Sequence, residues 1–435
     1  MALPKLRDLD KYGVITDVDP FDLPLGAWSM ALNVRFEDGR INSAPVWRAV
    51  GAPLTNTSPR FCYVANKADN TTAIFVGSKD GSVISWTSAA ETPVSVSGYT
   101  PSDAEVTWTG CTLAEVHYLN REDRVPWALG PTATQFSNLT GWNAGWRCKL
   151  LRSYASALVA LNITKAGVRY PTMIKTSDIV TDPGIAPSTW DEADATNNAT
   201  ENLLTEMNGE IVDAAQLGNA FILYSNSETW QMTADGSSDV YAYRKLPFNA
   251  GAISTNCVVE VNNRHYVFGA NDIWMHDGLT MESIADKRVR KFIFKSMNAK
   301  QSGKFLTSYN PTLNTLSFNF VSGDQFVSFT GAGCNRAAVY SISNGTWTFD
   351  DTPLVFAAGY SKTSLQALTW GTVTDMGNYG RLVAGPRRRL QARHGVRRRD
   401  RRASNGSCVR AGPLRRRSAY LSGGHSGYTP CHAPT

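Results

Sequence analysis

Residues 71–87 read TTAIFVGSKDGSVISWT, and this stretch decides the class of fold. Two runs rich in apolar and β-branched residues flank the dipeptide Asp80-Gly81, which accepts the positive φ angles that two-residue hairpin turns need. The first run, AIFVG, is apolar at consecutive positions, which is typical of a strand that is buried on both faces. The second run ends on Trp86. The stretch therefore predicts an antiparallel hairpin with a bulky aromatic residue on its outgoing strand.

The same unit recurs along the chain. Each copy is an aliphatic or aromatic strand, a polar turn, and a strand that carries Trp or another aromatic residue. The copies lie at residues 157–174 (a looser case), 217–233, 263–278 and 335–351, the last with an Asn344-Gly345 turn. Adjacent units lie roughly 40–60 residues apart where no longer insertion intervenes, as from 157–174 through 217–233 to 263–278, and this is the spacing of four-stranded propeller blades. The chain is therefore predicted to be all-β and β-propeller-like, and the alternative is a β-sandwich with long loops.

Composition divides the chain into three parts. Residues 1–58 hold several prolines and few periodic apolar residues, and we predict an extended N-terminal arm or docking segment there. Residues 59–385 hold the repeated units and are predicted to form the β-propeller body, whose completeness at its C-terminal end is open. Residues 386–435 form a tail of a different composition.

Helix is scarce in the sequence. Residues 192–208 are a candidate for one short helix. Residues 284–295 predict either a helix or a strand, because their apolar positions fit neither period well.

The tail differs from the body in charge as well. Residues 387–435 contain 13 Arg, no Lys, one acidic residue, and no Ile, Phe, Met or Trp. A segment with so little apolar surface does not offset its ordering entropy, so we predict that residues 386–435 are disordered. Two origins are open. One is a genuine arm that binds DNA phosphates by counterion release, and the other is out-of-frame translation of a GC-rich gene, which the absence of Lys favours.

The body is acidic once the tail is set aside. It keeps 30 basic residues, 43 less 13, and 36 acidic residues, 37 less one, for a net charge of −6. Acidic side chains gather in one segment, at Asp178, Asp182, Asp191, Glu192 and Asp194. Such a segment suits the wall of a channel that repels a polyanion. The alternative is that these are ordinary solvated loop residues.

One basic run interrupts the acidic body. It consists of Lys287, Arg288, Arg290, Lys291 and Lys295. This run is a candidate subunit interface, because opposite charges on two patches of a ring-forming subunit would set the register between neighbours. The alternative is again a solvated face.

Cysteine usage and hydropathy fit a protein that folds in a cytoplasm. The cysteines are widely and irregularly spaced without a C-x-x-C pair, so we expect neither a zinc site nor a disulfide framework. The first five are predicted to be small buried hydrophobes, namely Cys62, Cys111, Cys148, Cys257 and Cys334. No apolar run approaches the roughly 20 residues that cross a bilayer. Residues 1–10 carry charges and lack the apolar core of a signal peptide.

No catalytic signature stands out. The body has only three histidines, His117, His265 and His276, and contains no H-E-x-x-H, G-x-S-x-G, P-loop or Rossmann fingerprint. His276 is predicted to end a strand before a turn rather than to act in catalysis. We therefore expect no enzymatic activity, no cofactor and no metal ion.

The rival interpretation is a propeller-type glycan-binding or glycoside hydrolase module. Residues 78–81 and 343–347 come near the Ser-x-Asp-x-Gly-x-x-Trp box of propeller sialidases, but both lack the residue between the acidic position and Gly. A glycosidase needs two carboxylates about 5–10 Å apart, one of them with a raised pKa. The sequence singles out no such pair.

Four patches, in order along the chain, carry a resemblance to a known family. The first is DLPLGAWSMALNVRFEDGRINSAPVWRAVG at 22–51, with an Arg-x-x-x-Gly-Arg turn at Arg35, Gly39 and Arg40. The others lie at residues 146–194, 209–232 and 249–294. Their order and spacing make the match fairly specific, although none is a catalytic signature. The chain resembles the tail nozzle proteins of short-tailed phages (podoviruses), also called tail tubular protein B or packaged-DNA stabilisation protein.

The resemblance implies a structural role in the virion. Members of this family form a ring of six subunits, whose propellers surround an axial channel below the adaptor ring of the tail. The implied partners are five further copies of the chain, the adaptor ring, other tail proteins, and genomic DNA that passes without sequence specificity. The implied location is the virion tail after assembly in the host cytoplasm. The chain departs from the family near residue 386, where family members continue with further propeller and tip sequence.

Overall fold

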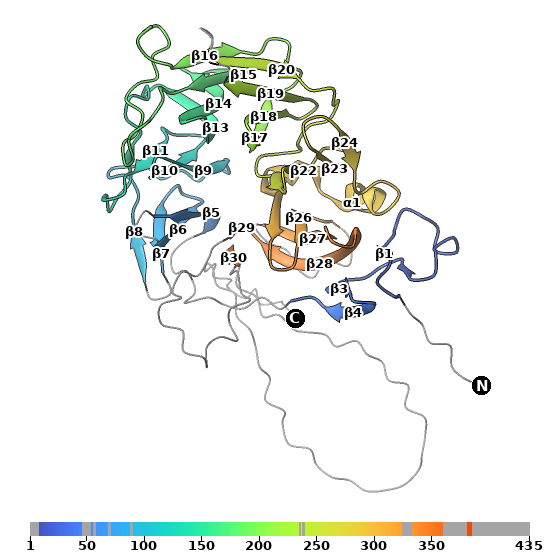
Figure 1. Ribbon diagram of the computed structural model, residues 1–435. Coiled ribbons are helices and arrows are strands. Elements are labelled where there is room, and N and C mark those ends of the chain that lie inside the picture. Colours follow the sequence, from blue (N-terminus) through green and yellow to red (C-terminus); the bar gives the residue numbers. More distant parts are fainter. Residues whose placement is uncertain are drawn as a thin grey trace, which may run out of the picture.

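The protein is a six-bladed β-propeller in a computed structural model that describes residues 8–45, 54, 58–67, 71–87, 90–234, 236, 240–323, 333–359 and 381–384. Six separate four-stranded sheets follow one another along the chain, and every strand in them pairs antiparallel with its sequence neighbour. Figure 1 shows the sheets arranged around a common centre in sequence order. This confirms the predicted all-β propeller and excludes the β-sandwich, in which the strands would form two facing sheets.

Blades 1 to 3 come first in the chain. Blade 1 comprises β5 (Pro59–Asn66), β6 (Thr72–Ser78), β7 (Val83–Trp86) and β8 (Glu91–Pro93). Blade 2 comprises β9 (Trp108–Leu113), β10 (Val116–Arg121), β11 (Trp127–Leu129) and β12 (Ser137–Asn138). Blade 3 comprises β13 (Trp146–Tyr154), β14 (Ala157–Lys165), β15 (Val168–Thr176) and β16 (Thr200–Leu203).

Blades 4 to 6 complete the set of four-stranded sheets. Blade 4 comprises β17 (Ile211–Leu217), β18 (Ala220–Ser225), β19 (Thr229–Ala234) and β20 (Tyr241–Lys245). Blade 5 comprises β21 (Val258–Val261), β22 (Arg264–Phe268), β23 (Ile273–His276) and β24 (Met281–Ser283). Blade 6 comprises β25 (Leu306–Asn310), β26 (Thr315–Phe320), β27 (Cys334–Ser341) and β28 (Thr346–Leu354), and is preceded by the helix α1 (Arg290–Ser296) and the 3₁₀ segment η1 (Ala299–Lys304).

A two-stranded sheet lies between blade 6 and blade 1. It pairs β29 (Phe356–Gly359) with β30 (Arg381–Ala384), and β29 contacts both β25 and β5, the first strands of the two flanking blades. Phe356 packs against the cores of both neighbours, and its ring lies edge-on to Phe61 at a centroid distance of 4.7 Å. The ring of inner strands is therefore closed by this short sheet, in a seventh position that is only two strands wide.

Aromatic side chains on the later strands of each blade fill the space between blades. Trp86, Trp230, Trp274 and Trp347 are all buried, and each lies on the outgoing strand of a hairpin, where the recurring unit predicts an aromatic residue. Trp274 on blade 5, for example, packs against Tyr224 of blade 4 at a centroid distance of 6.3 Å. The five cysteines of the described chain are also buried and unpaired, as predicted.

The N-terminal arm packs on the outer edge of blade 6. Its β1 (Gly13–Val14) pairs in parallel with β2 (Ala27–Trp28), and β3 (Val34–Glu37) forms a hairpin with β4 (Arg40–Ser43). Both β1 and β3 contact β28, and Leu32 bridges to Phe349. Figure 1 shows this arm outside β28, apart from the ring of blades.

Two local predictions were wrong. Residues 192–208 hold turns and the strand β16 instead of a helix, because this segment supplies the outer strand of blade 3. The Asp80-Gly81 and Asn344-Gly345 hairpins have four-residue loops in which only the glycine takes a positive φ, +89° and +63°. Of the two options for 284–295, the structure has a helix, α1. No helix in the described ranges is long and apolar enough to span a membrane.

The tight two-residue turns occur elsewhere, at residues that favour them less. Ala155 and Ser156 join β13 to β14 with φ angles of 47° and 63°, and Ala114 and Glu115 join β9 to β10 with 48° and 64°. Such left-handed conformations are steric outliers for side chains other than Gly, Asn and Asp. The pairing of long strands on both sides of each turn imposes them, which is why the sequence pattern did not reveal these turns.

Candidate functional site

Arg35 fastens the N-terminal arm to blade 6. Its two terminal nitrogens donate to the two carboxylate oxygens of Asp350, at 2.8 and 2.5 Å, and one of them also reaches the Thr348 hydroxyl at 3.3 Å. Both charged side chains are largely withdrawn from solvent, with 11% and 12% exposed. A bidentate pair in this setting fixes orientation as well as distance, so the β3–β4 hairpin is held on β28.

The remainder of the Arg-x-x-x-Gly-Arg motif forms the hairpin turn itself. Asp38 and Gly39 take φ angles of 53° and 75°, the geometry of a tight two-residue turn, and Arg40 pairs with Glu37 across it. The Gly39 amide donates to the Asp10 carboxylate at 2.7 Å. The motif on which the family resemblance partly depends is thus a structural device that shapes and anchors the arm.

The basic run lies beside the arm, on and just before α1. Arg288 donates to the backbone oxygen of Tyr12, and Arg290 pairs with Asp286 at 3.1 Å and more distantly with Asp272 at 3.9 Å. The backbone amide of Lys291 donates to the carboxylate of Asp17 in the arm. Part of the predicted subunit interface is therefore used within the chain.

The other charges of this run point outward. The side chains of Lys287, Lys291 and Lys295 are exposed and form no ion pair with any residue that the structure describes. They are the members of the predicted basic interface that are available to a partner.

An apolar pocket of about 240 Å³ lies between the arm and α1. Its apolar lining comes from the arm and from the surface of blade 6 and α1, namely Ile15, Val18, Pro20, Met30, Phe292 and Phe349. We call it the arm pocket. The loop that joins β1 to β2 projects beside it and exposes 98% of Phe21 and 94% of Leu25. Contiguous exposed apolar patches mark interaction surfaces, and Phe21 and Leu25 are therefore candidate contacts for a partner.

The predicted acidic residues lie on the outer part of blade 3, in the long loop between β15 and β16. Several of them stabilise turns within the loop. Asp178 accepts from the amides of Ile179 and Asn198, and hydrogen bonds from Thr196 lower the pKa of Asp194. Asp182 and Asp191 are exposed, and the pattern of Asx turns gives the loop a defined shape. We call residues 178–194 the acidic loop.

Glu192 has a separate role, because it closes over a buried lysine. Lys175 in β15 is inaccessible to solvent, pairs with Glu192, and reaches Glu201 at 3.1 Å. Its ammonium group also lies 4.8 Å from the ring centre of Trp146. Contact with Lys175 lowers the pKa of Glu192 despite the opposing effect of burial. No local sequence pattern predicts this cluster, since its members come from three different strands and a loop.

The centre of the propeller holds a cavity of about 280 Å³. Its lining comes from the inner strands of several blades and includes Arg152, Asp213 and Asn256. Arg152 donates to the Asp213 carboxylate at 2.8 Å, and burial raises the pKa of Asp213 against the effect of that arginine. A DNA duplex, whose major groove alone is about 12 Å wide, does not fit this cavity. Asp213 is the single acidic residue in its described lining.

The buried histidines form a closed hydrogen-bond chain around Tyr224. The hydroxyl of Tyr224 lies 2.6 Å from Nδ1 of His265 and 2.6 Å from Nε2 of His276. The Gly278 amide donates to Nδ1 of His276, and Nε2 of His265 lies 2.8 Å from the backbone oxygen of Gln216. These end partners fix both tautomers, so His276 donates to Tyr224 and Tyr224 donates to His265. As predicted, His276 ends a strand, β23, before a turn.

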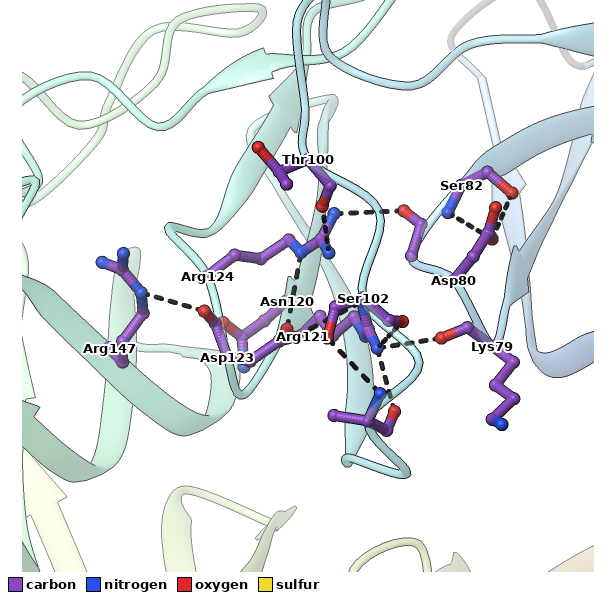
Figure 2. Close-up of polar contacts among 12 residues, drawn as sticks. Lys79, Asp80, Ser82, Thr100, Ser102, Asn120, Arg121, Asp123, Arg124 and Arg147 are labelled. Carbon is purple, nitrogen blue, oxygen red and sulfur yellow. Dashed lines mark hydrogen bonds and ion pairs between the residues drawn. The ribbon is translucent and has the colours of Figure 1, made fainter.

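A second polar cluster fastens blade 1 to blade 2 (Figure 2). One terminal nitrogen of the buried Arg121 donates to the backbone oxygens of Lys79, Ser102 and Ala104, at 2.9, 3.1 and 3.0 Å. Asp123 lies 3.4 Å from another nitrogen of the same guanidinium group. Figure 2 shows Arg121 extending toward the backbone of Lys79 and Ser102. One terminal nitrogen of Arg121 is thus committed to carbonyl groups of the neighbouring loops, while its Nε and its other terminal nitrogen are buried without a hydrogen bond to a described residue.

Gly81 is part of this cluster. A Cβ atom at this position would lie 2.4 Å from side-chain nitrogens of both Arg121 and Arg124, so a side chain there would displace the two guanidinium groups. The Asp80-Gly81 segment that came near a sialidase box thus serves the packing of blade 1 on blade 2. Asp80 itself accepts hydrogen bonds from the amide and hydroxyl of Ser82 within the loop.

Within the described residues, no group of three or more His, Cys, Asp or Glu side chains is arranged to hold a metal ion. Burial raises the pKa of Cys62 and of Cys111 to about 12, which keeps these thiols protonated at neutral pH. The features that sequence reasoning missed are the exposed Phe21 and Leu25 and the arm pocket. Their signal in the sequence is weak, because exposure of an apolar residue depends on which elements pack beside it.

Comparisons with known proteins give no family. No protein-family model matches the sequence, and no curated protein matches it. Among solved structures, the chain is similar to the β-propeller domain of Cps50 (Swd1) from Myceliophteria thermophila, with 7% identity and a TM-score of 0.41 over 69% of this chain and 89% of that chain. It is also similar to YCF48 bound to D1 peptide, with 9% identity and a TM-score of 0.40 over 70% and 87% of the two chains. The propeller assignment rests on the six sheets and their order, and neither similarity adds to it.

Proposed function

We propose that this chain is a structural subunit of the tail of a short-tailed phage, of the nozzle type. In this proposal six copies form a ring that retains packaged DNA and later passes it out, below an adaptor ring and in contact with other tail proteins. The observation that carries the proposal is the apolar surface on the arm, where Phe21 and Leu25 stand almost fully exposed beside the arm pocket. A propeller with such a surface is suited to assembly with partners.

The resemblance of residues 22–51 to the opening of nozzle proteins supports the same proposal. Residues 22–45, the described part of that stretch, fold into the greater part of the arm, and Arg35 fastens them to the propeller through Asp350. The arm is therefore an added element on the rim of the body, which is where a ring-forming subunit needs its contacts.

The DNA channel of this proposal runs between copies of the chain. The central cavity of a single propeller is too small for a duplex. A body with a net charge of −6, after the tail is set aside, offers little attraction to phosphate groups. Loose contact suits a conduit, since many phosphate-binding lysines and arginines would retain the duplex through salt-dependent binding.

We propose that the chain is not an enzyme. Tyr224, His265 and His276 use their polar atoms on one another and on backbone groups. In the central cavity, Asp213 faces Arg152 rather than the second carboxylate that a glycosidase would need. No observation favours the glycan-directed alternative, which stays as the outcome to be tested against.

Electron microscopy of the negatively stained, purified chain tests the proposal. We expect closed rings of six propellers with an axial opening wide enough for a duplex, and a matching mass by light scattering. A monomer at all concentrations, combined with hydrolysis of a glycan panel, would replace the nozzle proposal with the glycoside hydrolase. An electrophoretic assay should show weak DNA binding without sequence preference.

A further inference from the structure

The cavity of about 280 Å³ at the centre of the propeller is lined from five blades and from the closing sheet. The inner strands β9, β13, β17, β21, β25 and β29 each contribute at least one residue to its wall. In Figure 1, β9, β13 and β17 face the centre of the ring. A concave site that several elements build together, with apolar walls and a few convergent polar groups, is typical of a site for a small ligand.

The charged residues of the cavity wall cancel each other. Arg152 and Asp213 are the two charged residues in its described lining, and the Arg152 guanidinium group donates to the Asp213 carboxylate at 2.8 Å. The Asp213 side chain is only 3% exposed, and it also accepts from the amide of Ala214 at 2.9 Å. The wall therefore presents a neutral ion pair and offers a ligand no net charge.

Arg152 keeps hydrogen-bond donors that the described chain does not use. A guanidinium group has five N–H donors. Those of Arg152 reach Asp213, the backbone oxygen of Ala214 at 3.2 Å and, more weakly, that of Leu151 at 3.5 Å. One N–H on each terminal nitrogen therefore has no partner among the described residues. The side chain lines the cavity and is 17% exposed, so these donors are accessible to a bound molecule.

Two further polar side chains of the wall are also unused. The side-chain amide of Asn256 and the hydroxyl of Ser153 form no hydrogen bond to a described residue, and both side chains are half-buried. The larger apolar side chains of the wall are Phe221, Val258 and Phe356. The cavity therefore combines apolar surface with free donors and acceptors, which bind either water or a ligand.

We propose that the central cavity binds a small uncharged molecule that carries a carboxamide group on an apolar body. The carbonyl oxygen of the amide accepts from Arg152, its NH₂ group donates to the side-chain oxygen of Asn256, and the body lies against Phe221 and Phe356. A carboxamide matches this wall because it offers an acceptor and donors without a net charge. The inference goes beyond the structural role proposed above, and it holds whether or not copies of the chain form a ring.

Charged molecules of the same shape fit this wall less well. A carboxylate would gain the free N–H groups of Arg152, but it would stand beside Asp213, which has the same sign of charge and shares that arginine. An ammonium group would meet the positive charge of Arg152. Taking either ion out of water without a counter-ion of its own is unfavourable. The wall therefore selects against both signs of charge.

Three probes that share one ring test the class of ligand, namely benzamide, benzoate and benzylammonium. Each is titrated into the purified full chain and followed by ligand-observed NMR, which measures weak binding. We expect a dissociation constant on the order of 1 mM for benzamide, and values at least about tenfold higher for the two ions. Tighter binding of either ion than of benzamide, or no binding of benzamide, overturns the proposal.

Variants test whether the probe occupies the cavity. Asn256→Gly removes the side-chain amide and suits the φ angle of 63° at this position, so it should weaken benzamide binding at least about fivefold. Asn262→Gly is the matched control, because Asn262 has a φ angle of 53° in an exposed turn of the same blade but lies outside the cavity wall. It should leave binding unchanged. Equal affinities of the two variants for benzamide contradict the proposed site.

Asp213→Asn tests the balance of charge in the wall. It leaves Arg152 without its counter-ion, so benzoate should bind at least about tenfold more tightly than to the wild-type chain. Circular dichroism and thermal melts show whether each variant is folded, and the probe series with Asn256→Gly decides the question if Asp213→Asn does not fold. An unchanged affinity of folded Asp213→Asn for benzoate overturns the proposal. Ring formation without benzamide binding would overturn this inference alone and leave the nozzle proposal standing.

Discussion

The hydroxyl of Tyr224 shows how one atom can specify the protonation of two neighbours. It accepts from His276 and donates to His265, so both imidazoles are neutral and each has one defined tautomer. Burial lowers the pKa of His265 to about 4, and burial together with the neighbouring His265 lowers that of His276 to about 3. The network therefore joins blade 4 to blade 5 through hydrogen bonds in addition to apolar contacts.

The lowered pKa values make the folded protein sensitive to acid. Below the unfolded-state pKa of about 6.5 the unfolded chain binds more protons than the folded one, so stability falls as the pH falls, down to the folded-state values of about 4 and 3. Each histidine contributes a loss of up to about 1.4 kcal/mol per pH unit in that window. Denaturation by urea at pH 7.5, 6 and 5 measures it.

A variant isolates the contribution of the network. Tyr224→Phe leaves the His276 donor and the His265 acceptor unpaired, and should cost at least about 1–3 kcal/mol at neutral pH. Tyr266→Phe is the control, since the hydroxyl of that buried tyrosine makes no hydrogen bond to a described residue. Equal stability of the two variants would contradict the network.

The turn at Ala155 and Ser156 stores conformational strain in an exposed position. Both residues have positive φ, and replacing them with Asn and Gly should raise the free energy of unfolding by about 0.5–1 kcal/mol. Gly167→Ala gives the matched opposite change, because Gly167 sits in the equivalent turn between β14 and β15 at φ +83° with open space around it. Thermal melts of the two variants should shift in opposite directions.

At the scale of elements, the arm depends on the pair of Arg35 and Asp350. We expect Arg35→Ala and Asp350→Ala each to destabilise the arm, with a coupling energy of about 1–3 kcal/mol in a double-mutant cycle. The arm should also become more sensitive to protease between residues 8 and 45. Arg40→Ala is the control, since Arg40 is an exposed residue at the hairpin turn. A protease pattern shared by Arg35→Ala and Arg40→Ala would show that the pair does not hold the arm.

The strands also show how much of the fold could be predicted from the sequence. Hairpins with Trp86, Trp274 and Trp347 were visible because strand propensity, turn residues and a recurring aromatic all lie close together in sequence. The strand β16 was mistaken for helix because it is short and polar, and its pairing with β15 across the acidic loop is a long-range choice. A local sequence pattern therefore predicts a single hairpin, but it does not predict the outer strand that completes the blade.

The candidate interaction surfaces were likewise only partly predictable from the sequence. The acidic loop and the basic run were visible as charge patterns, but charge alone did not show that Arg288 and Arg290 are used within the chain. Phe21 and Leu25 looked like ordinary members of a Pro-rich segment. Only the packing of Ile15 and Val14 on the body, with Phe21 left outside, distinguishes buried from exposed apolar residues.

At the scale of the whole molecule, the ring is closed by Phe356. Phe356→Ala should destabilise the propeller, by less than the about 3–5 kcal/mol typical of a fully buried Phe, because Phe356 is only half-buried. The hydrogen exchange of amides in β5 and β25 should increase, since β29 contacts both strands. Unchanged exchange in β5 and β25 would contradict this role.

The narrow sheet of β29 and β30 also determines how the molecule comes apart. The ring consists of six four-stranded sheets and this two-stranded sheet. Under mechanical tension or heat, the two-stranded sheet should be the first to separate from its neighbours. Rupture there turns the circle into an open arc whose two ends are the first and sixth sheets, while the joints between the other blades stay intact. The ring therefore opens first at this sheet. A covalent cross-link from β29 to β5 should stabilise the fold more than a cross-link between any other pair of neighbouring sheets.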